Sequence, residues 1–360
     1  RQAILRFQNL DFSREFEMNK KLLVAAIAAA ATLPMAAQAG VQIYGVIHAS
    51  IDYVDSDRDD VRSFWDVSSS SGRSRIGVKG TEDLGNGLKA IWKAESEVNM
   101  DNGGQGKFTN RNTYIGLAGD WGTFLYGRHD TPLKISTGKL DFFADTLADY
   151  NSTLGFIDRR VGDAIAYISP NMAGFTVAGA AVPGHDANSG ADGIADGYSL
   201  AAMYSNNAIY ASLAYEDISD WLNLGIDDTI WRVGLGWLGE TFQVVGVYEN
   251  QDVGSGSNNE TRDVWQISAG YNFGNNTLKG MYGQAGNFGF SDLEINEDDD
   301  KRDAWAIGLD HKLSKRTKAY VLYTDSELAV HDHVAETLGG GSAFRSEERR
   351  VGKECRSRWS

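Results

Sequence analysis

The feature that most constrains this chain is the rhythm of its connections. Segments in which apolar and polar residues alternate are joined, in turn, by very short and by long connections. Alternation at period two is typical of strands with one apolar and one polar face. Fifteen such segments begin near residues 41, 74, 87, 111, 122, 164, 174, 198, 208, 229, 241, 264, 277, 303 and 317.

The connections alternate in length along the whole series. Tight turns include Asp120–Trp121 and Gly239–Glu240, whereas long loops include residues 55–72, 129–159 and 184–197. Outer-membrane barrels show this asymmetry, because their periplasmic turns are short and their external loops are long. Strands in hydrocarbon must pair into a ring, and the core has no apolar run of about 18 residues that would form a membrane-spanning helix. The sequence therefore predicts an all-β fold, a transmembrane antiparallel β-barrel.

Both ends of the chain are expected to lie outside this barrel. Met18–Ala39 contains two lysines, an apolar run and a small-residue exit site, which is typical of a cleaved secretory signal peptide. Residues 1–17 resemble upstream DNA translated in frame, and residues 345–360 form a basic tail that resembles translated adaptor DNA. The predicted barrel is therefore residues 40–344. An exported chain of this kind is expected in the outer membrane of a Gram-negative bacterium.

Three blocks of sequence carry a resemblance to a known family: Ser74–Glu95, Asn110–Leu133 and Tyr167–Ala180. Together they resemble the general diffusion porins of Gram-negative bacteria, in particular their Neisseria-type branch. The resemblance implies a sixteen-stranded barrel that assembles as a homotrimer among outer-membrane lipid and lipopolysaccharide and passes ions and small hydrophilic solutes. Such porins end on a strand that pairs with the first and closes with an aromatic residue, of which only Gly339–Phe344 remains. About fifteen strands are thus expected intact, with the sixteenth beyond a truncated end.

The resemblance also assigns a pore constriction. In the resembling family the third loop folds into the lumen and presents carboxylates toward arginines on the wall, and residues 129–159 take the place of that loop here. Matching residue by residue from Gly127 and Arg128 puts Asp141 and Asp145 at the acidic loop positions. The wall positions fall on Arg75, Arg111 and Arg160, with Arg159 as an alternative to Arg160.

Strand parity bears on the wall residues. Arg75 and Lys79 alternate with apolar residues that are expected to face outward, so both are expected on the lumen side. Arg111 shares the parity of Ile115 and Leu117, so its assignment needs a β-bulge or is wrong. Opposed rows of opposite charge would set a transverse field across the constriction.

Four tryptophans lie near strand ends with the outward parity of the apolar residues: Trp231, Trp237, Trp265 and Trp305. They are expected in the aromatic girdles at the membrane interfaces. The alternative is an aromatic path for sugars through the lumen.

Charge and motifs bear on the remaining function classes. The net charge of −15 gives no basic footprint for nucleic acid, and no nucleophile elbow is present, so neither catalysis nor a cofactor or metal is expected. The predicted function is passive diffusion through a water-filled channel. The alternatives are a substrate-specific channel and an outer-membrane barrel enzyme. The acidic balance favours cations, although salt screens loop charges beyond roughly 8 to 10 Å.

Overall fold

The computed structural model describes residues 40–55, 63–68, 74–98, 109–184, 193–218, 227–255, 258–286, 302–326 and 349–359, which excludes the predicted signal peptide and residues 1–17. The strands are β1 (Gln42–Asp55), β2 (Phe64–Ser68), β3 (Arg75–Gly85), β4 (Leu88–Glu97), β5 (Thr113–Gly119), β6 (Gly122–Asp130), β7 (Arg160–Ile168), β8 (Phe175–Val182), β9 (Gly197–Asn206), β10 (Ile209–Asp217), β11 (Asp227–Leu238), β12 (Phe242–Ser255), β13 (Asn258–Phe273), β14 (Asn276–Ala285), β15 (Arg302–Lys312), β16 (Thr317–Ser326) and β17 (Arg349–Trp359). All fifteen predicted segments are strands, namely β1 and β3 to β16.

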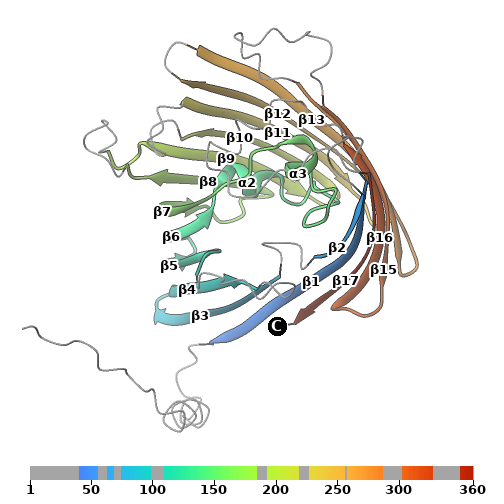
Figure 1. Cartoon of the computed structure of the whole chain (residues 1–360). Helices are drawn as coiled ribbons and strands as arrows, with labels where there is room; N and C mark the ends of the chain where they lie inside the picture. The colour runs from blue at the N-terminus through green and yellow to red at the C-terminus, as the bar shows by residue number, and fades with distance from the viewer. Residues whose placement is uncertain are drawn as a thin grey trace, which may run out of the picture. The chain divides into compact units, whose positions relative to one another are not determined.

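The strands form one antiparallel sheet, in which each strand from β3 to β16 is paired with the next in sequence (Figure 1). Strand β1 pairs with β3 through Gln42–Val46 and, farther along, with the short strand β2. The backbone of β17 pairs with both β16 and β1, so the ladders run through sixteen strands and return to β1. The sequence predicts that residues 345–360 lie outside the barrel and that the sixteenth strand lies beyond the truncated end, but in the structure residues 349–359 pair as that strand. The hydrogen bonds of a ladder are made by backbone groups, so the edges of β1 and β16 can pair with this basic segment.

The two faces of the sheet differ as the alternation predicts. On β11, Trp231 and Trp237 are 49% and 55% exposed, whereas the intervening Arg232 is fully buried. The exposed face is apolar on the other strands too, with Ile115, Leu213 and Ile307 among its members. An apolar outer face and a polar inner face are what a barrel in hydrocarbon requires.

The connection from β6 to β7 carries the only helices of the described residues, α2 (Pro132–Thr137) and α3 (Tyr150–Leu154). Thr131 caps α2, and Asp149 caps α3 through the N–H of Asn151. Helix α3 ends at Gly155, whose φ of 76° is readily adopted by glycine. We call residues 131–159 the inner loop, since α2 and α3 lie within the curve of the sheet (Figure 1). Neither helix, nor any other in the described part of the chain, is long and apolar enough to cross a membrane.

Candidate functional site

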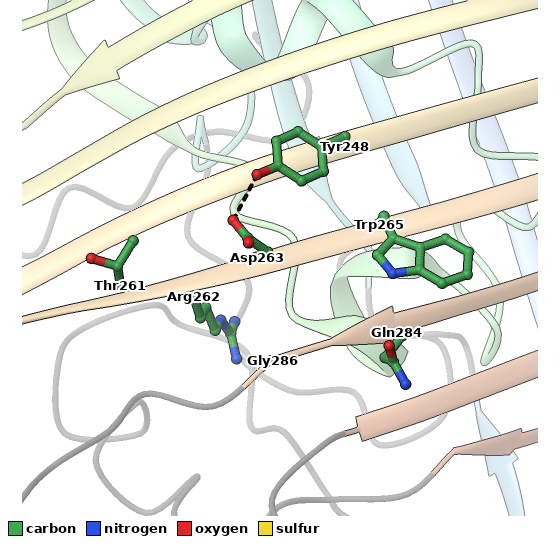
Figure 2. A pocket seen from close by; sticks show the side chains of 7 residues that line it. All are labelled: Tyr248, Thr261, Arg262, Asp263, Trp265, Gln284 and Gly286. Atoms are coloured by element: carbon green, nitrogen blue, oxygen red, sulfur yellow. Dashed lines mark hydrogen bonds between the residues drawn. The ribbon is translucent and has the colours of Figure 1, made fainter.

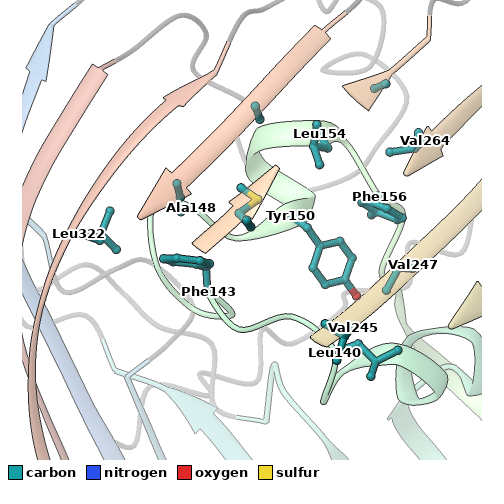
Figure 3. Close-up of a cluster of buried hydrophobic side chains, with 14 of the residues drawn as sticks. Leu140, Phe143, Ala148, Tyr150, Leu154, Phe156, Val245, Val247, Val264 and Leu322 are labelled. Carbon is teal, nitrogen blue, oxygen red and sulfur yellow. The ribbon is translucent and has the colours of Figure 1, made fainter. Parts of the chain in front are cut away.

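The inner loop packs against one side of the inner wall. Its buried side chains Phe143, Tyr150 and Leu154 share one apolar cluster with inward residues of β12 to β16, including Val247 and Leu322 (Figure 3). Burying an aromatic or leucine side chain contributes about 1.5 to 3 kcal/mol each. Part of the loop is therefore held on the wall by apolar packing.

A buried arginine on β11 bonds to the side of the inner loop that faces the wall. Arg232 Nη1 lies 2.6 Å from an Asp158 carboxylate oxygen, and its Nη2 donates to the carbonyl oxygen of Ile157 at 2.6 Å. The same guanidinium pairs with Glu249 of β12 and donates to Thr137 Oγ1 at 3.0 Å. Arginine suits this position because its planar fork holds several acceptors while staying charged. Arg232 thus joins both ends of the loop to the wall.

Three further cations fasten the loop to the same side. Arg159 pairs with Glu216 and Asp228, so its side chain faces away from the wall position that the sequence offered as an alternative to Arg160. Arg262 Nη2 donates to the carbonyl oxygen of Gly155 at 2.8 Å. Lys279 Nζ donates to the carbonyl oxygen of Phe142 at 2.8 Å. These bonds fix the loop at its middle and at its end.

The opposite wall carries a group of basic side chains that we call the basic wall: Arg75, Lys79, Lys93, Arg111 and Arg160. Lys79 and Lys93 are directly paired positions of β3 and β4. Arg160 Nη2 lies 2.9 Å from Asp130, and its Nε donates to Asn112 Oδ1 at 2.9 Å. The structure thus brings together all four basic residues that the sequence assigned to the wall.

Arg111 joins the basic wall without a bulge in its own strand. Strand β5 begins only at Thr113, and residues 111–112 form a bend, so the in-and-out alternation does not extend to Arg111. Its N–H bonds the carbonyl oxygen of Glu95 at 3.2 Å, and its Nε donates to Glu95 Oε1 at 2.9 Å. The parity conflict therefore has a local cause, the bend before β5.

The two acidic loop residues have different surroundings. Asp145 is about one-third exposed, and its Oδ2 lies 3.9 Å from Arg75 Nη1 of the basic wall. Asp141 is buried and accepts from the N–H groups of Phe143 and Tyr150 at 2.8 and 3.3 Å. Burial, and then the nearby Asp149 carboxylate, hold the pKa of Asp141 well above its usual range. Asp141 therefore organises the loop, whereas Asp145 presents a charge to the wall.

Sequence reasoning missed four residues of this arrangement: Tyr44, Lys93, Glu95 and Arg232. Lys93 and Glu95 carried a usable signal, since they alternate with Trp92 and Ala94 on β4 and share the polar parity. The alternation of β11 predicts only that Arg232 lies on its polar side, because the loop partners Asp158 and Ile157 lie 74 and 75 positions away along the chain.

The tryptophans assigned to the interfaces face outward. Trp231, Trp237 and Trp305 are 41 to 55% exposed, and Trp265 is half-buried. Figure 2 shows Trp265 beside Tyr248, whose hydroxyl donates to Asp263 at 2.7 Å, around a hollow of about 440 Å³. Such a mixture of aromatic rings and polar groups is typical of a membrane interface.

An outward apolar barrel with a charged lumen and an inner loop defines an outer-membrane diffusion channel. The Gram-negative porin profile matches residues 24–328, and the chain belongs to this family. It is 28% identical over 332 residues to the major outer membrane protein P.IB of Neisseria lactamica, covering 84% of this chain and 92% of the relative. It is 30% identical over 317 residues to P.IB of Neisseria meningitidis serogroup B, with the same coverage.

Solved structures show the same fold. An anion-selective porin from Comamonas acidovorans matches with a TM-score of 0.71 at 21% identity, covering 89% of this chain and 99% of that one. OmpF of Salmonella typhi, in complex with daunomycin, matches with a TM-score of 0.66 at 14% identity, covering 89% and 97%. The chain is therefore an outer-membrane channel for passive diffusion, and its relatives are channels rather than enzymes.

Proposed function

We propose that the constriction of this porin lies between the inner loop and the basic wall and that it favours anions. The observation that carries the proposal is the local charge. Five cations of the basic wall face three carboxylates: Glu95 and Asp130, which are bonded among them, and Glu97, which is directly paired with Arg75. The inner loop adds three cations and three carboxylates that are at least partly exposed, and their charges cancel: Lys134, Lys139, Arg159, Asp145, Asp149 and Asp158.

Local charge outweighs total charge at a constriction. The chain as a whole carries −15, which favours cations when composition alone is considered. Charges beyond roughly 8 to 10 Å are largely screened in physiological salt, whereas close groups on low-dielectric walls are not. The sign of the basic wall should therefore set the sign of ion preference. The Comamonas acidovorans porin that shares this fold is anion-selective, which is consistent with the proposal.

The preference can be read from a salt gradient. With the chain reconstituted in a planar bilayer between unequal KCl solutions, we expect a reversal potential of the sign set by chloride. Replacing Arg75 and Arg160 by glutamine should move that potential toward zero, because two of the five wall cations are removed. A wild-type potential of the sign set by potassium would refute the proposal.

We further propose that the chain assembles as a homotrimer in contact with outer-membrane lipid and lipopolysaccharide. Members of the family are generally trimeric.

The outward faces of β1, β3 and β5 carry exposed aliphatic side chains, namely Ile43, Ile51, Ile76, Ile115 and Leu117. Trp92 of β4 lies directly on Gly80 between them. A smooth aliphatic face suits contact with a second copy, and mass measurement in detergent should give three chains; a single chain would contradict it.

A further inference from the structure

A carboxylate lies at the centre of the basic wall. The side chain of Glu95 on β4 is 4% exposed. Its Oε2 accepts from the Tyr44 hydroxyl at 2.7 Å and lies 3.1 Å from Lys93 Nζ, while its Oε1 accepts from Arg111 Nε at 2.9 Å. Arg75 Nε is 3.9 Å from the same carboxylate. Three cations and a hydroxyl thus converge on one anion.

The surroundings of Glu95 keep it in this place. The ring of Tyr44 lies directly on Gly77 of β3, where an added Cβ would meet ring atoms at 2.5 Å. Lys79 and Lys93 each place their ammonium 5.4 Å from the centre of that ring. The ring is therefore held on the wall by a close backbone approach and by two cations, and its hydroxyl holds Glu95.

The donors around Glu95 are the groups that would bind a permeating anion. Charge-assisted hydrogen bonds from lysine and arginine to an oxyanion are strong when partly buried. Conduction, however, requires that a site attract an ion and also release it. A cluster of Arg75, Lys93 and Arg111 without an internal carboxylate would hold oxyanions too long for rapid passage.

We propose that Glu95 is a resident counter-anion that determines specificity by keeping the basic wall from retaining multivalent anions. The Glu95 carboxylate occupies the position where a permeating oxyanion would otherwise bind. A permeating anion is therefore attracted by the positive charge of the basic wall, but it cannot accept hydrogen bonds from all the donors around Glu95 at once. This inference rests on the proposed anion preference of the same constriction.

The test removes the negative charge of Glu95 by substitution and measures how strongly the channel then binds inorganic phosphate. Single-channel conductance is recorded against phosphate concentration for the full chain and for Glu95→Gln, which keeps the volume and an acceptor for Tyr44. We expect near-linear conductance for the wild type. For Glu95→Gln we expect saturation, with the half-saturating concentration lowered at least about tenfold, the effect of one charge-assisted contact.

Two matched variants separate local coordination from net charge. Asp120→Asn removes an exposed carboxylate in the turn between β5 and β6, so it makes the same change in net charge away from the basic wall and should leave conductance near-linear. Glu95→Asp keeps the charge and should behave as the wild type does. If Glu95→Gln does not fold, Glu95→Gln with Lys93→Gln relieves the repulsion and still leaves Arg75 and Arg111 to produce saturation.

The outcomes are distinct. A folded Glu95→Gln variant with unchanged, near-linear conductance overturns the proposal, as does equal saturation in Asp120→Asn. The wild-type reversal potential tests the anion preference separately. A potential of the cation sign together with saturation in Glu95→Gln would overturn that preference and leave the role of Glu95 standing.

Discussion

Replacing Arg232 by methionine is expected to lower the free energy of unfolding by about 3 to 5 kcal/mol. Arg232 and its partner Glu249 are both fully buried, and Arg232 also neutralises Asp158 of the inner loop. Methionine fills much of the same volume but leaves two carboxylates without their cation. Removing one partner of a buried pair is costly because the remaining charge stays away from water. The midpoint of urea unfolding in detergent, followed by tryptophan fluorescence, measures the effect.

A double variant separates the ion pair from the volume of the side chain. Arg232→Met combined with Glu249→Gln removes the orphaned charge on the wall and should recover a large part of the lost stability. Arg232→Met should also make the open-channel current noisier, since the loop loses its bonds at Ile157 and Thr137. A stability loss of under about 1 kcal/mol, the size of a surface pair, would contradict the assigned role of Arg232.

Much of the barrel could be predicted because its physics is local. The outward faces of β11 and β15 could be predicted from the alternation around Trp231 and Trp305. In a strand, the position of a residue in the sequence alone determines the face on which its side chain lies. The same local rule placed Arg75 and Lys79 on the lumen side. It failed at Arg111, where a bend precedes the strand and the period of two no longer applies.

The packing of the inner loop could not be predicted, because it depends on contacts between distant parts of the chain. The resemblance placed Asp141 and Asp145 together as acidic positions, yet the fold turns Asp141 inward to bond loop amides and leaves Asp145 facing Arg75. Gly234 and Gly236 on the inner face of β11 carry one sequence signal of this packing, since Leu140 of the loop lies against both.

These inward glycines mark where the inner loop rests on the wall. An added Cβ at Gly234 would lie 2.6 Å from Leu140 Cδ1 and 2.9 Å from Thr137 Cγ2. At Gly308 of β15 it would lie 3.0 Å from the Phe143 ring. Contacts this short leave no room for a side chain. Small residues on the wall therefore set how far the loop stands from β11 and β15, and thereby how much of the lumen stays open.

Replacing Gly234 by valine is accordingly expected to push Leu140 and the start of the loop toward the basic wall. Overpacking of this kind costs about 1 to 3 kcal/mol and displaces the less constrained partner, which here is the loop rather than the hydrogen-bonded strand. Single-channel conductance should fall, because the loop narrows the passage that it borders.

The matched control is Gly246→Val on the neighbouring strand β12, where an added Cβ meets only the carbonyl oxygen of Gln266 at 3.7 Å. That variant should conduct as the wild type does, since ordinary contact distance leaves the loop in place. Equal conductance in Gly234→Val and the wild type would mean that the loop accommodates the added volume without moving toward the basic wall. The width of the constriction would then be set by the internal fold of the loop rather than by its contacts with β11.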